Sequence, residues 1–265
     1  MSGDGWVSRP RSVASCEVLA EAVALRAAHL GTGGYGVAYG SHTDGSAGPT
    51  SDLDLLLVGT EPLLPERMRT LADDVISLHR RHGLGLDREV SYDSKLHATT
   101  GQVDQATWLR GFTLTADGDI AVEPVVAEPW FLESPAFKLR LILNALTVPH
   151  VFLGGDVALY EHHRTRAERA TALLALALLG DREETTVGDA VAVLRGDPAG
   201  PHGEDFLGHT ERAGRAPALF SALQRALGAL EREGVISTCD GVLIRQYADR
   251  RRALLRELVS PAVGG

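Results

Sequence analysis

The chain has little of three features that mark particular classes of protein: cysteine, long apolar runs and a secretory start. Its two cysteines, Cys16 and Cys239, leave no second pair for a disulfide framework or a four-ligand zinc site. The longest apolar run, 172–179, is far below the roughly 20 residues that a membrane-spanning helix requires. The first residues lack the charged start and apolar core of a secretory signal. We therefore expect a cytoplasmic protein with no membrane partner.

Positive charge is also scarce. Lysine and arginine number 26 against 35 aspartates and glutamates, a formal net charge of −9 at pH 7. Proteins that bind nucleic acid usually carry a basic stripe, and the densest basic run here, 250–252, falls within a predicted helix. This excludes nucleic acid as the expected partner and mildly favours cationic small molecules. The only lysines are Lys95 and Lys138, a scarcity that we interpret as compositional bias without mechanistic meaning.

What is present is the composition of an ordinary globular protein, with 44% hydrophobic and 23% charged residues. The first 130 residues alternate between helical and extended patterns. Apolar spacing, helix-stop glycines and turn residues predict helices over 13–30 and 65–82, a loop over 42–50, and strands over 37–39, 52–58, 86–92 and 120–126. This order is an α+β pattern.

Beyond Trp130 the pattern becomes helix after helix. Ser134-Pro135 resembles a helix start, Asp156 can cap a helix that runs towards residue 179, and Thr186 with Asp189 resembles a capping box. Two further helices are predicted, over 217–233 and 244–259. We therefore predict two domains, 1–130 and 131–265, of which the second is an α-helical bundle.

The residues that indicate chemistry lie between residues 40 and 89. Gly40 follows a strand and lets a backbone approach a phosphate, to which the Ser41 hydroxyl can donate. Asp52 and Asp54, two apart on a strand, point to one face and can share hard cations such as Mg²⁺. Glu89 can add a third carboxylate that binds a second metal or accepts a proton. Together they predict a phosphoryl or nucleotidyl transfer site.

This segment resembles the nucleotidyltransferase superfamily that includes DNA polymerase β, whose pattern is Gly-Ser, a short loop, Asp-x-Asp and one later acid. More narrowly, Gly40-Ser41, Asp44-Gly45, Pro49 and 51–56 are similar to the aminoglycoside adenylyltransferases that modify streptomycin and spectinomycin. The strand 89–92 is similar to the strand that carries the catalytic base in that branch.

The resemblance implies an N-terminal polymerase-β-like nucleotidyltransferase domain, a mixed sheet with flanking helices, and a helical domain that binds the acceptor. It implies transfer of AMP from ATP, or of another nucleoside monophosphate, to a hydroxyl of a small molecule such as an aminoglycoside or natural-product intermediate, releasing pyrophosphate. Two Mg²⁺ ions would be held by Asp52, Asp54 and Glu89, with Glu89 as base. Gly40, Ser41 and Ser51 would contact the nucleotide.

Several alternatives stay open from sequence. Asp87 lies on the same predicted strand face as Glu89 and is the second candidate for the base. The lysine that the family carries before a later aspartate is Gly188 here, so a cation on the ATP side is either missing or supplied by an arginine. The acceptor can instead be a protein side chain, as in antitoxin-type enzymes that AMPylate proteins, or the chain can be a non-catalytic NTP-binding regulatory module. The sequence leaves the oligomeric state open.

Overall fold

The computed structural model is an α+β structure. It describes residues 14–44, 47–86, 93–107, 112–114, 120–122, 135–178, 184–195, 215–232, 236–239 and 242–245. The predicted strand over 86–92, with Asp87 and Glu89, lies outside the described residues except for its first position. The predicted strand over 120–126 is described only at 120–122, and the predicted strands over 37–39 and 52–58 can be compared in full.

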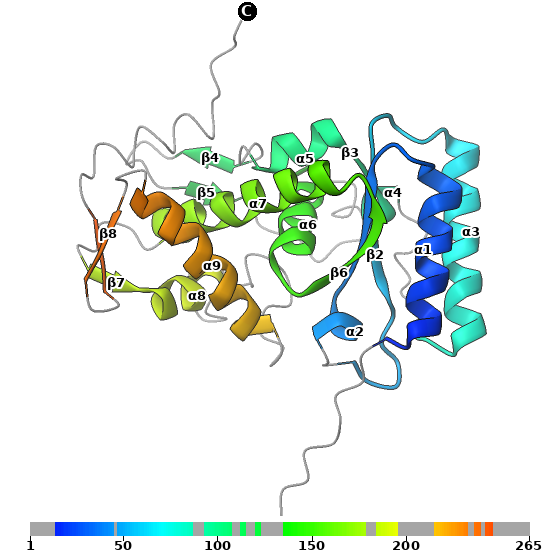
Figure 1. Cartoon of the computed structure of the whole chain (residues 1–265), viewed down its shortest axis with the longest axis horizontal. Helices are drawn as coiled ribbons and strands as arrows, with labels where there is room; N and C mark the ends of the chain where they lie inside the picture. The colour runs from blue at the N-terminus through cyan, green and yellow to red at the C-terminus, as the bar shows by residue number, and fades with distance from the viewer. Residues whose placement is uncertain are drawn as a thin grey trace, which may run out of the picture.

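The centre of the structure is a four-stranded mixed sheet in the order β3-β2-β1-β6 (Figure 1). Its strands are β1 (Tyr35–Tyr39), β2 (Asp54–Gly59), β3 (His97–Thr99) and β6 (His150–Gly155). β1 pairs antiparallel with both β2 and β6, whereas β2 pairs parallel with β3. A parallel pair requires a crossover connection, which here includes a long helix between β2 and β3.

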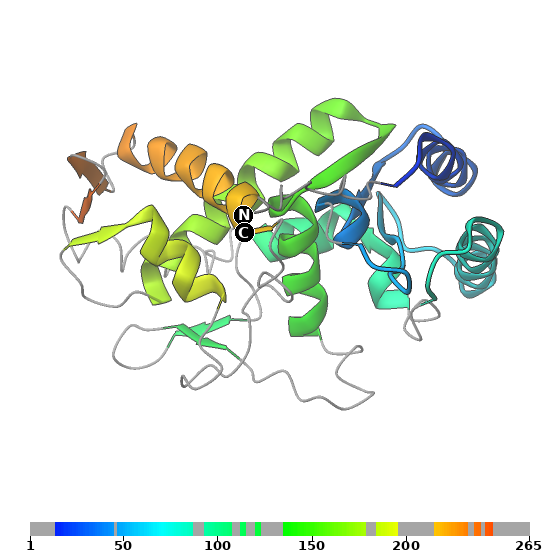
Figure 2. The ribbon, with the colours of Figure 1, turned by 90° about the horizontal axis from the view of Figure 1, so that it is seen from below.

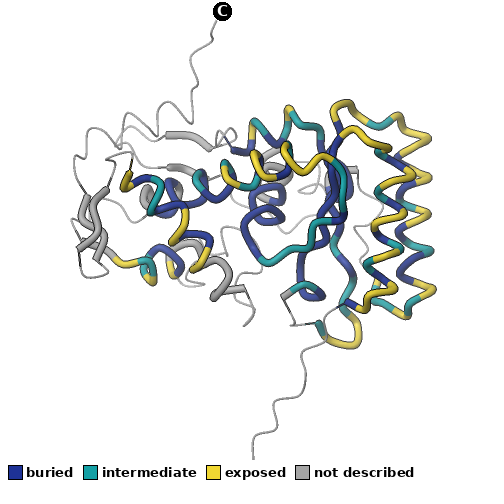
Figure 3. Tube along the Cα trace, in the orientation of Figure 1, coloured by how far each residue is buried: buried dark blue, intermediate teal, exposed yellow. Residues whose placement is uncertain are grey.

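Two helices, α1 (Cys16–Leu30) and α3 (Pro65–His82), cover one face of the sheet. Their ends obey the sequence signals: Ser15 caps α1, proline opens α3, and Gly31 and Gly83 end the two helices with positive φ angles of 61° and 62°. Figure 2 shows both helices end-on beside the sheet, and Figure 3 shows their inner sides buried and their outer sides exposed. Both predicted helices are confirmed.

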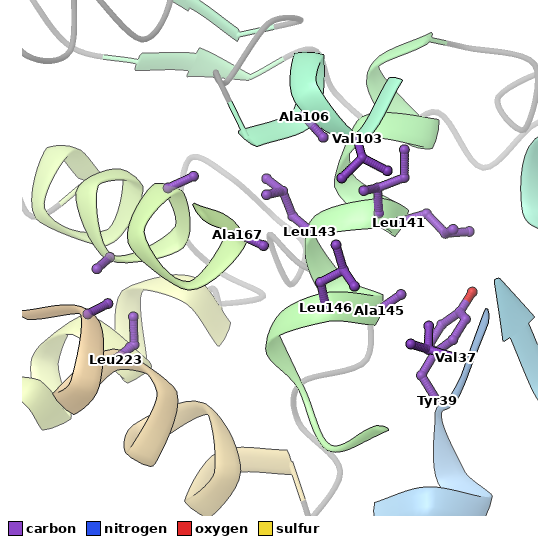
Figure 4. Packing of buried hydrophobic residues seen from close by; sticks show 14 of the residues in the cluster. Val37, Tyr39, Val103, Ala106, Leu141, Leu143, Ala145, Leu146, Ala167 and Leu223 are labelled. Carbon is purple, nitrogen blue, oxygen red and sulfur yellow. The ribbon is translucent and has the colours of Figure 1, made fainter. Parts of the chain in front are cut away.

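The opposite face carries the helices of the second half of the chain. α6 (Pro135–Thr147) packs on β1 and against α5 (Thr100–Thr107), a helix of the first half that lies on β2 and β3. α7 (Val157–Leu178) and α9 (Arg215–Arg232) extend the same buried cluster. In Figure 4, Val37 and Tyr39 of β1 face Leu146 and Ala145 of α6. The cluster runs without interruption from the sheet into the helices.

Alternation along β2 decides which side chains belong to which face. Leu55 and Leu57 are buried against the α1 and α3 side, whereas Leu56 and Val58 belong to the cluster under α6. Asp54 has the same parity as Leu56 and Val58. Its carboxylate therefore lies on the face that the second half of the chain covers.

Smaller elements complete the described chain. α2 (Ser41–Asp44) follows β1, and α4 (Asp93–Leu96) precedes β3. β4 (Phe112–Leu114) pairs with β5 (Ile120–Val122), and α8 (Val187–Arg195) follows β7 (Glu184–Thr186). β7 forms a small sheet with β8 (Ile236–Cys239) and β9 (Val242–Arg245), in the order β7-β9-β8.

Several local predictions for the second half are confirmed. The Leu159 backbone N–H donates to Asp156 Oδ1 at 2.9 Å, so Asp156 caps α7. Thr186 and Asp189 form a reciprocal capping pair: the Thr186 N–H donates to Asp189 Oδ2 at 2.8 Å and the Asp189 N–H donates to Thr186 Oγ1 at 3.1 Å. Short aspartate therefore suffices where glutamate is the usual partner.

Other predictions need correction. Residues 41–44 form a helical turn where a loop was expected from residue 42. The predicted helix over 244–259 is wrong at residues 244 and 245, which belong to β9, and its remainder lies outside the described residues. The second half is not purely helical, because it supplies β6 to the central sheet and builds the sheet β7-β9-β8. A short apolar run such as 242–245 has the same sequence pattern as one turn of a buried helix. Hydrophobic periodicity therefore does not distinguish a strand from a helix there. The division into domains at residue 130 stays a prediction.

None of the helices among the described residues has the length and apolarity needed to cross a bilayer.

A buried tyrosine–histidine pair joins β1 to α7. The Tyr35 hydroxyl and His163 Nδ1 share a hydrogen bond of 3.0 Å, and His163 is 1% exposed. Burial lowers the pKa of His163 to about 4, against a smaller opposing effect of the Asp104 carboxylate. Burial also raises the pKa of Tyr35. Both groups are neutral at physiological pH.

We expect His163 to make the fold sensitive to acid. The unfolded chain takes up the proton near pH 6.5 and the folded chain only near pH 4, so this contribution is complete above pH 6.5 and is lost as the pH falls towards 4. The full difference is about 3 kcal/mol. In urea unfolding, the stability advantage of the wild type over His163→Gln should shrink by about 2 kcal/mol between pH 7.5 and 4.5.

The exposed neighbour provides the control. His162→Gln should keep the pH dependence of the wild type. An identical pH dependence in His163→Gln and the wild type would contradict the assignment.

Candidate active site

The turn after β1 and the start of β2 approach each other closely. The register sets Tyr39 opposite Asp54, so the next residue, Gly40, lies beside the Asp54 carboxylate. Gly40 has a φ angle of 84°, and a Cβ atom added to it would lie 2.0 Å from Asp54 Oδ2. Only glycine tolerates both the backbone conformation and this contact. The Gly-Ser motif therefore makes room for the second acid of the Asp-x-Asp motif.

The two predicted metal-binding acids converge on a single ammonium group. Lys95 Nζ lies 3.2 Å from Asp54 Oδ1 and 3.7 Å from Asp52 Oδ2. The side chains of Asp52, Asp54 and Lys95 are 23%, 14% and 11% exposed. Lys95 belongs to α4, which leads directly into β3, the parallel neighbour of β2. Asp52 precedes β2 and does not lie within it, yet its carboxylate reaches the same point as that of Asp54.

Ser41 begins α2 directly after Gly40 and is 1% exposed. Its Oγ atom is buried and makes no hydrogen bond within the part of the chain that the structure describes. Buried hydroxyls usually have a partner, so this one is available to a ligand. Ser41 directly follows Gly40, which contacts the Asp54 carboxylate. Donation by its hydroxyl to a phosphate oxygen stays a prediction.

Ser51 has a different role in the structure from Ser41. Its Oγ accepts a hydrogen bond from the Gly48 N–H at 2.9 Å, and its carbonyl accepts from the Gly85 N–H at 2.9 Å and from His42 Nε2 at 3.1 Å. These bonds close the loop that leads into Asp52. Nucleotide contact by Ser51 stays a prediction.

A buried histidine holds the backbone between the two acids. The Leu53 N–H donates to His79 Nε2 at 3.0 Å, and His79 Nδ1 lies 2.7 Å from the Val75 carbonyl one turn earlier on α3. Because Nε2 accepts and Nδ1 donates, the ring is the neutral Nδ1–H tautomer. His79 is fully buried, so α3 fixes the strand from behind while the acids face the opposite side.

The structure thus brings together Gly40, Ser41, Asp52 and Asp54. Glu89 and its alternative Asp87 lie outside the described residues, so the third acid is untested. Across the described ranges, no group of three His, Cys, Asp or Glu side chains is arranged to hold a metal ion.

The residues present nevertheless fit Mg²⁺. Asp52 and Asp54 offer the hard oxygen ligands that Mg²⁺ prefers. Their carboxylates already share one cationic group, the ammonium of Lys95, so the point between them favours positive charge. Two carboxylates are also the usual number that a protein contributes to a magnesium ion bound to phosphates.

Sequence reasoning missed Lys95 and His79. Lys95 is one of two lysines in a chain whose other basic residues are arginines, and this rarity was the available signal. The spacing of Lys95 from the acids along the chain gives no signal, because α3 and the rest of the crossover lie between it and Asp54. His79 lies on the apolar side of α3 among Val75 and Leu78, where its pattern indicates packing only.

Comparison with models of protein families and with curated proteins finds no match for this chain.

We expect Gly40→Ala to disturb the site more than the fold. The new methyl group would meet the Asp54 carboxylate and impose a φ angle that alanine disfavours, at a cost of about 1–3 kcal/mol. Gly48→Ala is the matched control, because a Cβ there has no neighbour closer than 4.0 Å. Thermal unfolding and Mn²⁺ titration should show loss of stability and of metal affinity for Gly40→Ala alone. Equal behaviour of the two variants would contradict the close approach.

We also expect His79→Leu to leave the Leu53 N–H buried without a partner. An unpaired buried donor costs about 1–3 kcal/mol in the free energy of unfolding. His82→Gln, a change on the same helix at a partly exposed residue bonded to Glu21, should cost less than 1 kcal/mol. Denaturant unfolding of both variants measures the difference. A loss for His79→Leu no greater than for His82→Gln would show that this bond does not hold the segment.

Proposed function

We propose that the protein is a Mg²⁺-dependent nucleotidyltransferase that moves a nucleoside monophosphate, AMP from ATP in the first instance, to a hydroxyl of a small molecule and releases pyrophosphate. The observation that carries this proposal is the convergence of the Asp52 and Asp54 carboxylates on one cation position. Gly40 approaches Asp54, and the Ser41 hydroxyl that follows it makes no hydrogen bond among the described residues. A metal-bound triphosphate presents a cation and phosphate oxygens. The two carboxylates are suited to the cation, and the Ser41 hydroxyl is suited to a phosphate oxygen.

Each group has a defined task in this proposal. Asp52 and Asp54 would hold the metal, which when bound neutralises charge on the phosphates during transfer. The Ser41 hydroxyl would donate to a phosphate oxygen in a position fixed by the turn at Gly40. Glu89 would complete a second metal site and accept the proton of the attacking hydroxyl, as the sequence pattern suggests.

A small-molecule acceptor is favoured by the way the second half covers the acidic face. Asp54 lies on the side of the sheet under α6, so under this proposal the helices beyond residue 135 would bound the acceptor from that side. An acceptor with positive charge, such as an aminoglycoside, suits the net charge of −9. These features support the proposal and leave the acceptor to be identified by experiment.

One observation favours a second candidate, a non-catalytic NTP-binding module. Lys95 lies against both acids, and a permanent ammonium there would compete with a catalytic metal. In that case the protein would bind nucleotide and have no turnover.

The test is incubation of the purified chain with Mg²⁺, each of the four NTPs and acceptors that include streptomycin and spectinomycin. We expect pyrophosphate release and a nucleotide-sized mass gain on one acceptor. Asp54→Asn should reduce turnover by at least 100-fold with the fold intact, because it removes a ligand of the charge-neutralising ion. Asp73→Asn, at an exposed carboxylate on α3, should keep normal turnover.

Two other results would redirect the proposal. NTP binding without modification of any acceptor or release of pyrophosphate would support the non-catalytic module. Near-normal turnover in Asp54→Asn would contradict the assignment of the metal site.

A further inference from the structure

Lys95 is the one described cation that contacts both acids of the candidate site. Its ammonium lies within 4 Å of a carboxylate oxygen of each aspartate, and the residue is only 9% exposed. Two carboxylates and one ammonium leave a formal charge of −1. Two partly buried carboxylates this close to a shared point would otherwise repel each other, so the ammonium stabilises the site in the absence of a ligand.

The same position creates a conflict with metal binding. A divalent cation held by Asp52 and Asp54 would stand within a few ångströms of the Lys95 ammonium. At that separation, repulsion between a unit and a double charge amounts to several kcal/mol in a partly buried site. The ammonium must therefore leave the acids when the metal arrives, or the metal must bind weakly.

A nucleotide offers the ammonium a new partner. The phosphates of a metal-bound nucleotide would lie next to the metal, and a lysine has a flexible four-carbon stem with three donors that can turn from a carboxylate to a phosphate oxygen. Such a move would exchange one charge-assisted interaction for another.

We propose that Lys95 is the resident counter-ion of the candidate site: it occupies the cation position while the site is empty and passes to the phosphates when metal and nucleotide bind together. The role of Lys95 as counter-ion rests on the described contacts, and its passage to the phosphates rests on the proposed function. Metal alone would then bind weakly, and nucleotide would increase metal affinity by removing a competitor as well as by adding ligands. Metal and nucleotide binding are thereby coupled through one side chain.

The first experiment titrates the protein with Mn²⁺ alone, a hard cation that uses the same ligands as Mg²⁺ and can be followed by its paramagnetism. Lys95→Met removes the competitor and should increase Mn²⁺ affinity about tenfold. Lys95→Arg keeps the charge and should stay within about twofold of the wild type. Arg81→Met, which removes a positive charge from the exposed end of α3, should also leave the affinity unchanged.

Unchanged or weaker Mn²⁺ binding in folded Lys95→Met would overturn the inference. This comparison needs neither nucleotide nor acceptor, so it is independent of turnover. If the wild type shows no NTP binding while Lys95→Met gains Mn²⁺ affinity, the role of Lys95 as counter-ion is supported and the proposed function is contradicted.

A second measurement covers the case in which Lys95→Met does not fold. The chain has only two lysines, so amine-directed labelling followed by peptide mass spectrometry reports Lys95 with Lys138 as internal reference. In the wild type, high Mn²⁺ without nucleotide should displace the ammonium and increase the labelling of Lys95 several-fold relative to Lys138. Adding ATP with the metal should reverse most of the increase. If Mn²⁺ does not change the labelling of Lys95, the metal does not displace the ammonium and the inference is overturned.

Discussion

The close approach of Gly40 to the Asp54 carboxylate is the constraint on which the site depends. It requires β1 and β2 to pair in one register, because a shift by one residue would turn Asp54 towards α1 and α3 and place a leucine against the turn. It also requires a residue without Cβ at position 40. The apolar alternation of β2 fixes that register, since Leu55 and Leu57 must be buried on one face and Leu56 and Val58 on the other.

Around this contact the two faces of the sheet have different tasks. The face under α1 and α3 holds the backbone, because His79 of α3 accepts the Leu53 N–H. The face under α6 presents Asp54 and receives Lys95 from the adjacent strand end. The helix that holds the backbone and the elements that carry the charged groups are thus different parts of the structure. A substitution on the α1 and α3 face should therefore shift the acids although it does not contact them. Functional side chains are commonly positioned by such supporting residues.

The charge balance of the site links its stability to its function. Carboxylates placed for a divalent cation repel each other when no cation is present, and a protein must compensate for this while it is unliganded. Here the Lys95 ammonium compensates, and under the proposed function a metal would compete with it. The arrangement resembles a salt bridge in the unliganded protein and a ligand set in the loaded one. Lys95 reaches both acids because α4 leads directly into β3, the parallel neighbour of β2.

By itself, the sequence determined the helices α1 and α3, whose capping and stop residues act locally, and the positions of Gly40, Ser41, Asp52 and Asp54 within one short segment. Such features depend on neighbours within a few residues, which a single sequence displays. Only the tertiary structure decided that β6 from the second half completes the sheet, that Lys95 contacts both acids and that His79 bonds the backbone at Leu53 between them. These depend on strand pairing and crossover packing between distant segments, for which spacing along the chain contains no signal.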